Sequence, residues 1–136
     1  MSATYMLDTD TCAFILRRSS PALLARIVTV PLQQQVISVV TLAELLYGIQ
    51  LSSKKKANQA ALDVLLRHLT LLEINVDAAL HYAEIRADLI KKGQLIGAND
   101  LMIAAHARSI NAVIVTNNVR DFGHVKGLKL ENWMVS

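Results

Sequence analysis

Short runs of apolar residues, many of them β-branched, alternate along this chain with longer segments of helical character. The clearest runs are Val36–Val40 and Ala112–Thr116, and Thr4–Leu7 and Leu71–Ile74 show the same pattern. Leu128–Leu130 is a candidate for a short final strand. Continuous apolar strands separated by helices are typical of a parallel sheet that is covered on both faces. The alternation therefore predicts an α/β fold, with a central parallel β-sheet of four to five strands flanked by helices.

The segments between these runs carry the start signals of helices. Thr41 and Glu44 have the spacing of a capping box, and Asp77 and Asn99 are expected to cap the two helices that follow them. The polar stretches 52–56 and 117–121 are expected to be loops. The predicted helices are Thr9–Arg18, Pro21–Val28, Thr41–Leu51, Asn58–His68, Asp77–Lys92 and Asp100–Ser109.

Length and composition favour one domain over residues 1–136, because no repeat or linker divides the chain. Only 18% of the residues are charged and 53% are hydrophobic, so some apolar surface is expected to remain for association. The longest apolar stretch, Val36–Leu51, is interrupted by Glu44 and Gly48, and the N-terminus lacks the features of a signal peptide. The single cysteine, Cys12, excludes an internal disulfide and a multi-cysteine zinc site. We expect a cytoplasmic protein with no membrane partner.

Four acidic residues stand where a predicted strand ends or a predicted helix begins: Asp8, Glu44, Asp100 and Asp121. In a parallel α/β sheet these positions meet at one crevice. Carboxylates at ~4 Å repel one another by roughly 4 kcal/mol per pair at an effective dielectric constant near 20, and bound protons or a cation relieve that repulsion. An oxygen-only cluster suits Mg²⁺ or Mn²⁺. The four acids therefore predict a metal site for phosphodiester hydrolysis, which is the chemistry of a nuclease.

Each acid also has a purely local interpretation. Asp8 is placed to cap a helix, Glu44 to complete the capping box, and Asp100 to interact with a helix dipole. Asp121 has the character of a turn residue. Four separate strand-edge positions that are all acidic are better explained by one site than by four unrelated local roles.

Two other functional classes remain open. The segment Asp8–Thr11 has the D-x-D-x-T pattern of haloacid-dehalogenase-like phosphohydrolases, but that class needs a later lysine, and none occurs between Lys92 and Lys126. The chain is also short for that fold. A non-catalytic binding module with structural acids is the other alternative, and metal dependence distinguishes it from a nuclease.

The net charge of +3 suits an anionic partner without identifying one. The candidate RNA contacts are Lys54, Lys55, Lys56 and Arg120, although charged runs are also common on solvated faces. Cys12 is expected to be a packing residue, and His106 is expected to be a surface or packed histidine rather than part of a site.

Four blocks of the sequence resemble, in order, the motifs of PIN-domain ribonucleases, and in detail those of the VapC toxins of bacterial toxin–antitoxin pairs. The resemblance continues along the whole chain as far as Trp133. The blocks are Met6–Thr9, Thr41–Gly48, Ile96–Ala107 and Val115–Phe122.

This resemblance implies a PIN fold and an endoribonuclease that depends on Mg²⁺ or Mn²⁺. By position, Asp8, Glu44 and Asp100 match the acidic trio of the family. Asp8 and Asp100 are expected to hold the metal, with Glu44 as a further ligand or as an acceptor that orients the attacking water. Asp121 matches a less regular fourth acid.

Three further positions are expected to support the site. Thr116 matches a polar residue that helps to hold it. Asp10 stands where the family usually has asparagine, and Asn118 stands where many PIN domains have an acid. Asp10 or Asp121 is therefore the candidate for the fourth acidic group.

The resemblance also implies partners. The family's toxins are dimers that a VapB-type antitoxin holds inactive, and they reach operator DNA only through that antitoxin. The blocks look most like the enteric VapC toxins that cut initiator tRNA in its anticodon loop. Three tyrosines, two phenylalanines and one tryptophan are too few for an extended base-stacking platform, which favours a folded RNA read by its shape. We expect tRNA as substrate, with mRNA or rRNA as the alternatives.

Overall fold

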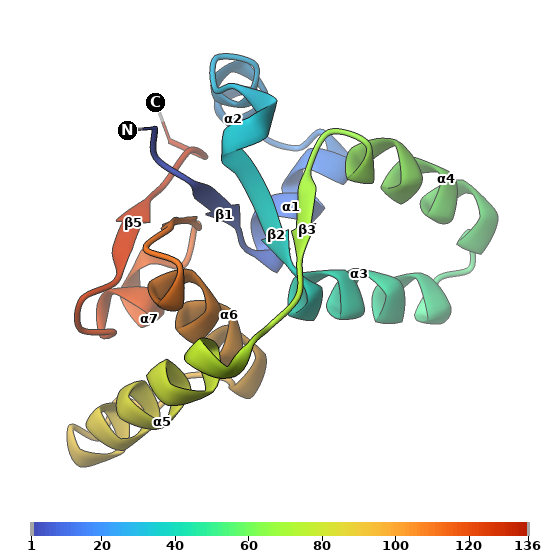
Figure 1. The fold of residues 1–136 in the computed structure, drawn as a ribbon. Helices are drawn as coiled ribbons and strands as arrows, with labels where there is room; N and C mark the ends of the chain where they lie inside the picture. The colour runs from blue at the N-terminus through green and yellow to red at the C-terminus, as the bar shows by residue number, and fades with distance from the viewer. Residues whose placement is uncertain (1, 136) are drawn as a thin grey trace.

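A five-stranded parallel sheet forms the centre of the protein in the computed structural model, which describes residues 2–135 (Figure 1). The strands lie in the order β3-β2-β1-β4-β5, and every neighbouring pair is parallel. The predicted α/β fold with a parallel sheet of four to five strands is therefore confirmed. The strands are β1 (Tyr5–Leu7), β2 (Gln35–Ser38), β3 (Thr70–Leu72), β4 (Val113–Val115) and β5 (Lys129–Glu131).

Helices cover both faces of the sheet. The first four lie on one side, with α3 and α4 forming the arm at the right of Figure 1, and the last three lie on the other side. They are α1 (Thr9–Arg17), α2 (Pro21–Ile27), α3 (Val39–Leu51), α4 (Lys55–Leu66), α5 (Val76–Lys91), α6 (Ala98–Ser109) and α7 (Val119–Gly123), with a short 3-10 turn, η1, at Leu32–Gln34.

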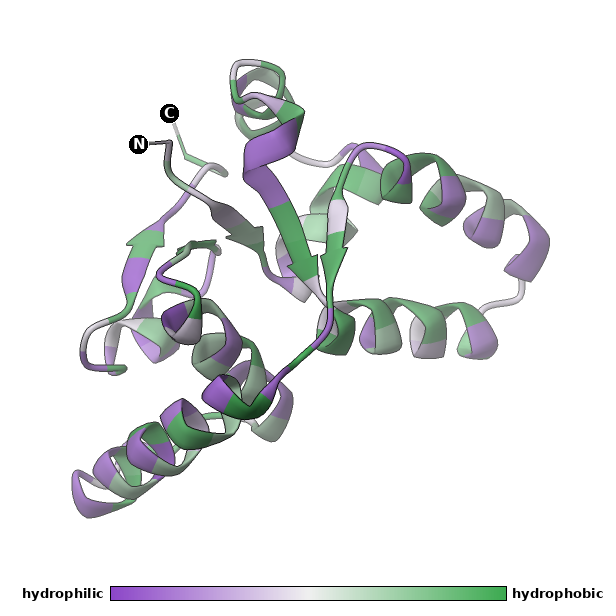
Figure 2. Ribbon diagram, in the orientation of Figure 1, coloured by the Kyte–Doolittle hydropathy of each residue, from purple (hydrophilic) through white to green (hydrophobic). Residues whose placement is uncertain are grey.

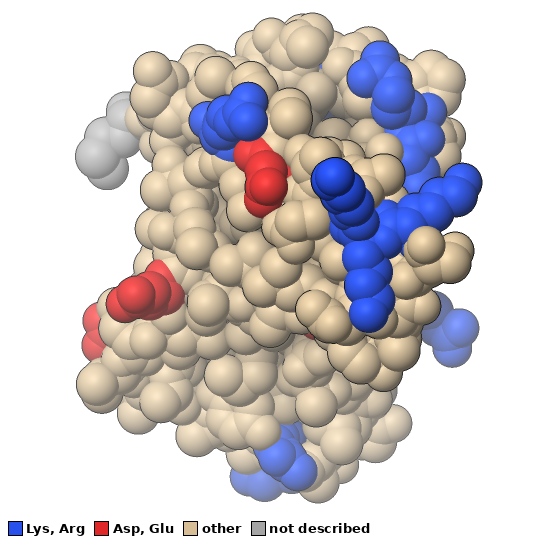
Figure 3. All heavy atoms as spheres, turned by 90° about the vertical axis from the view of Figure 1, so that its right-hand side faces the viewer, with Lys and Arg blue, Asp and Glu red and all other residues tan. Residues whose placement is uncertain are grey.

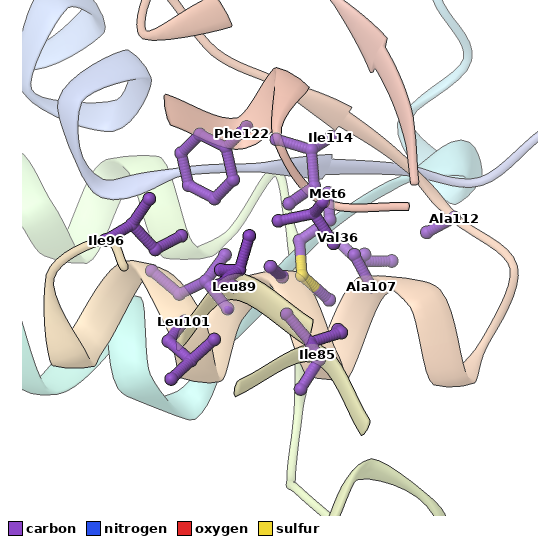
Figure 4. Packing of buried hydrophobic residues seen from close by; sticks show 14 residues of the cluster. Met6, Val36, Ile85, Leu89, Ile96, Leu101, Ala107, Ala112, Ile114 and Phe122 are labelled. Carbon is purple, nitrogen blue, oxygen red and sulfur yellow. The ribbon is translucent and has the colours of Figure 1, made fainter. Parts of the chain in front are cut away.

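Neighbouring residues of the central strands belong to two different cores, because successive side chains of a strand point to opposite faces. Met6 packs with α5, α6 and α7 in the first core, which Figure 4 shows around Phe122 and Leu89. Leu7 packs with α1 to α4 in the second core, together with Trp133. The strands are accordingly hydrophobic over most of their length, whereas the helices alternate between hydrophobic and hydrophilic residues (Figure 2).

The second strand ends two residues earlier than its β-branched sequence predicts. Ser38 is the N-cap of α3, and its Oγ accepts a hydrogen bond from the backbone N–H of Val40 at 3.1 Å. The cap outweighs the β propensity of Val39 and Val40, so the predicted strand to Val40 is wrong at that end. The capping box expected at Thr41 and Glu44 is wrong too, because both residues lie inside the helix.

Three other helix starts differ from the prediction. Asn75, rather than Asp77, caps α5, since its Oδ1 accepts from the backbone N–H groups of Asp77 and Ala78. Helix α6 begins at Ala98 after Gly97, so Asn99 lies inside it and does not cap it. Helix α4 begins at Lys55, which places part of the predicted loop 52–56 in its first turn.

Cys12 is buried, as its assignment to packing predicts, and His106 is the packed rather than the surface histidine of the two alternatives. Burial raises the pKa of the Cys12 thiol well above its usual range, so the thiol stays protonated. His106 Nδ1 lies 2.8 Å from Ser38 Oγ, and burial lowers the pKa of this imidazole. Neither group is available as a nucleophile or a base. No helix between residues 2 and 135 is long and apolar enough to cross a bilayer.

Candidate active site

The carboxyl edge of the sheet gathers all of the predicted acids. Asp8 follows β1, Glu44 lies in α3 directly after β2, and Asp121 lies in α7 just after β4, while Asp100 is in the first turn of α6. The pKa of Asp100 is raised to about 6, chiefly by burial and further by the charges of Asp8, Glu44, Asp10 and Asp121. Four carboxylates therefore lie close enough to Asp100 for their charges to act on it through space.

Asp8 is both a helix cap and a member of this cluster. Its Oδ1 accepts a hydrogen bond from the backbone N–H of Thr11 at 2.8 Å, so the local interpretation of Asp8 is correct. The residue is only 2% exposed. Burial raises the pKa of Asp8, and hydrogen bonds from the Thr116 and Thr11 side chains together with the Thr11 backbone oppose that rise. The cap holds this buried carboxylate in one orientation at the carboxyl edge of the sheet.

Glu44 is held by two residues that the sequence prediction did not include in the site. Thr9 Oγ1 donates a hydrogen bond to Glu44 Oε1, and Asn99 Nδ2 donates to Glu44 Oε2 at 3.2 Å. Each donor is the sequence neighbour of another acid, since Thr9 follows Asp8 and Asn99 precedes Asp100. That adjacency, and their place in the motif blocks Met6–Thr9 and Ile96–Ala107, are the sequence signals that point to them.

Asp121 is oriented by the residue that replaces an acid of the family pattern. Asn118 caps α7, and its Nδ2 donates to Asp121 Oδ2 at 3.1 Å. The backbone N–H of Asn118 donates in turn to the buried Thr116 Oγ1 at 2.9 Å. The segment predicted as a loop up to Asp121 is therefore wrong in its last part, because a short capped helix begins at Val119.

The arrangement is open rather than a closed cage. Across residues 2–135, no three side chains of His, Cys, Asp or Glu are gathered closely enough to form a ready metal site. Mutual repulsion accounts for such spacing, since carboxylates in contact disfavour each other's charge. The donors are all oxygens, and the pKa values of Asp8 and Asp100 are raised chiefly by burial and further by neighbouring negative charge, which a cation would offset. Both observations fit a hard divalent ion.

The candidate RNA contacts fall into two groups. Arg120 is exposed and shares α7 with Asp121. The lysine run 54–56 is also exposed, but it follows the far end of α3, about 12 Å along the helix from Glu44. The face formed by α3 and α4 shows more Lys and Arg than Asp and Glu surface (Figure 3). The structure thus puts Arg120 in the same short helix as Asp121, whereas the lysines lie beyond the far end of α3.

Comparisons with known proteins agree on one family. The family model described as PIN domain matches residues 5–128. Ribonuclease VapC2 of Rickettsia felis is 40% identical over 95% of this chain and 97% of its own length. The tRNA(fMet)-specific endonuclease VapC of Salmonella typhimurium is 37% identical over 95% and 97%, respectively. A chain of the DNA-bound VapBC structure from Salmonella typhimurium superposes with a TM-score of 0.91 at 36% identity, covering 97% of this chain and 99% of that one.

The raised pKa of Asp100 predicts that a lower pH stabilises the metal-free protein, because this carboxyl group then takes up a proton. The pKa is about 6 in the folded chain against an ordinary value of 3.8 for an aspartate, so the folded state binds this proton more tightly than the unfolded state. Ionised Asp100 therefore lowers the free energy of unfolding by its full amount above pH ~6. This effect disappears as the pH falls toward ~4. Asp100→Asn should therefore raise the urea midpoint in EDTA at pH 7.5, and less so at pH 5. Asp63→Asn, on the exposed face of α4, is the control, and a lower midpoint for Asp100→Asn at pH 7.5 would contradict the prediction.

Proposed function

The chain belongs to the PIN-domain family, within its VapC ribonuclease branch, and from that premise we propose the metal site and the RNA of this nuclease. Nucleases of this family generally depend on a divalent metal. We propose Mg²⁺ or Mn²⁺, held by Asp8, Asp100 and Glu44, with Asp121 as the fourth acid. The observation that carries this assignment is the gathering of the four acids at the carboxyl edge of the sheet, where the charges of the other three act on Asp100.

The residues have separate tasks in this proposal. A divalent cation bound here supplies Lewis acidity and lowers the pKa of a coordinated water. Asp8 is buried and fixed by its cap, so it offers a rigid oxygen ligand. Asp100 has no hydrogen-bond donor within the described chain, and it is therefore the carboxylate that is freest to approach a cation. Glu44 is half-buried and faces the crevice, where it accepts a proton from water or orients it.

No histidine is required as general base. The buried imidazole of His106 is already engaged with Ser38. Asp121 is oriented by the hydrogen bond from Asn118, and its carboxylate adds to the negative charge that attracts a cation to the site.

For the substrate we propose a folded tRNA, with the initiator tRNA cut in its anticodon loop. The Salmonella typhimurium relative is named as specific for tRNA(fMet). The acidic crevice itself repels RNA, so backbone contacts must come from exposed cations around it, with Arg120 the nearest of those predicted. The lysine run 54–56 lies farther from the acids, so it is placed to contact the backbone of another arm of a folded RNA and not the scissile phosphate.

For the partner we propose a VapB-type antitoxin, because the similar solved structures are VapBC complexes and two of them contain DNA. Operator DNA is then reached through the antitoxin. An apolar groove of about 460 Å³ lies between α1, α2 and α4, and Leu16, Val28, Leu32 and Val64 are among its lining residues. We propose that an antitoxin segment fills it, burying part of residues 9–28, and that an antitoxin arginine reaches the acids. Self-association into a homodimer is a further part of this proposal.

The nuclease assignment predicts that Asp8→Asn and Asp100→Asn lose activity without unfolding. Loss of a metal-holding carboxylate should reduce the cleavage rate in Mg²⁺ to below ~1% of wild type, while the far-UV circular dichroism stays unchanged. EDTA should have the same effect on the wild type, and Mn²⁺ should restore activity. Asp63→Asn should cleave at the wild-type rate. Cleavage by Asp8→Asn at the wild-type rate would show that the metal site lies elsewhere.

The substrate assignment predicts one dominant cut within a tRNA anticodon loop. Sequencing of RNA ends after brief induction should place that cut in the initiator tRNA. The same positions should be uncut after induction of Asp100→Asn, which serves as the matched control. Cuts spread over mRNA, or confined to rRNA, would rule out the tRNA substrate and leave the nuclease activity standing.

The partner assignment predicts that a charge in the groove weakens the antitoxin complex. Val64 is 48% exposed on α4 and lines the groove, so Val64→Glu should weaken binding at least ~10-fold by burying an unpaired carboxylate. Leu95 is 53% exposed in the loop before α6, away from the groove, and Leu95→Glu is the control. Calorimetry that finds equal affinity for both variants would contradict the proposed binding surface.

A further inference from the structure

The two oxygens of the Glu44 carboxylate are each held by a donor from a different helix. Thr9 belongs to α1 and donates to Oε1, whereas Asn99 belongs to α6 and donates to Oε2. Asp8 directly precedes Thr9, and Asp100 directly follows Asn99. The hydrogen bonds therefore connect Glu44 to the immediate neighbours of the two other acids that are proposed to hold the metal.

Neither donor is needed for the local structure of its own helix. Helix α1 is capped by Asp8, and α6 starts after Gly97 with no side-chain cap within residues 2–135. The Thr9 hydroxyl also lies 3.4 Å from Thr41 Oγ1, so it sits in the contact between α1 and α3. The side chains of Thr9 and Asn99 thus connect two helices and do not cap a helix end.

These links oppose the repulsion among the acids. Like charges on α1, α3 and α6 push those helices apart, and a hydrogen bond to an ionised carboxylate is among the stronger neutral-to-charged contacts. Because both oxygens of Glu44 are engaged, its carboxylate cannot rotate freely. The position of Glu44 relative to the other acids is then fixed before any cation binds. Fewer side chains have to move when the cation binds.

We propose that Thr9 and Asn99 are positioning residues that hold Glu44 at the place where it serves the metal site. This inference rests on the proposed function, since it assigns the two residues to the same site. Their loss should weaken metal binding and lower kcat, and it should leave the KM for RNA unchanged because neither residue contributes charge to the RNA surface.

The test is a Mn²⁺ titration of purified protein, followed by electron paramagnetic resonance. Thr9→Val keeps the shape of the side chain and removes the hydroxyl, and Asn99→Ala removes the amide. Each should raise the Kd for Mn²⁺ about 10-fold, which is the lower end of the effect of partners that orient metal ligands. Thr9→Ser keeps the hydroxyl and should restore affinity to within ~2-fold of wild type. Thr70→Val, on the exposed strand β3, is the matched control and should bind as wild type.

Two further measurements separate positioning from a general structural effect. In cleavage assays, kcat should fall about 10-fold for both variants while KM changes less than ~2-fold. In a Glu44→Ala background, adding Thr9→Val should change the Kd by less than ~2-fold, because the group through which Thr9 acts is already gone. Melting curves in EDTA verify that every variant is folded.

The outcomes distinguish this inference from the proposed function. Wild-type protein that binds Mn²⁺, Asp8→Asn that does not, and normal affinity in Thr9→Val and Asn99→Ala would overturn the positioning role alone. If Thr9→Val reduces the affinity for Mn²⁺ equally in the wild type and in the Glu44→Ala background, the positioning role is overturned as well. Wild-type protein that binds no Mn²⁺ would overturn both the metal site and the inference.

Discussion

Repulsion among five carboxylates at one edge of a parallel sheet is the constraint to which the rest of this structure responds. Burial is the main cause of the raised pKa of Asp100, about 6, and of the raised pKa of Asp8, and the charges of neighbouring acids raise both pKa values further. A cluster of like charges lowers the free energy of unfolding. The burial of apolar side chains in the two hydrophobic cores must offset this loss. A bound divalent cation relieves the repulsion, and this couples metal binding to stability.

The position of the crevice between two layers of helices explains how the acids are kept together. Asp8 and Glu44 come from the layer of α1 and α3, whereas Asp100 and Asp121 come from the layer of α6 and α7. Each layer packs on its own face of the sheet, and Phe122, next to Asp121, is fully buried in one core. The spacing across the crevice therefore depends on the sheet and on few direct contacts. The link from Asn99 to Glu44 is one of those direct contacts between the layers.

The sequence predicted the parts of this structure that follow from long-range regularity. Apolar runs between helices predict a parallel sheet, and acids at the ends of those runs predict a crevice. It failed where two local preferences compete. Ser38 and Asn75 cap α3 and α5 in place of the predicted Thr41 and Asp77. The geometry of the preceding strand decides which side chain reaches the free N–H groups. Thr9 and Asn99 were missed because the use of a polar side chain depends on which helix lies against it in the folded protein.

The most direct test of the account is anomalous diffraction from crystals grown with Mn²⁺. The account predicts an anomalous peak in the crevice, at a coordination distance of ~2.1 Å from carboxylate oxygens of Asp8 and Asp100, with Glu44 still bonded to Thr9 or Asn99. A peak only at another place on the molecule, or no peak at saturating Mn²⁺, would contradict the claim that these acids form one metal site.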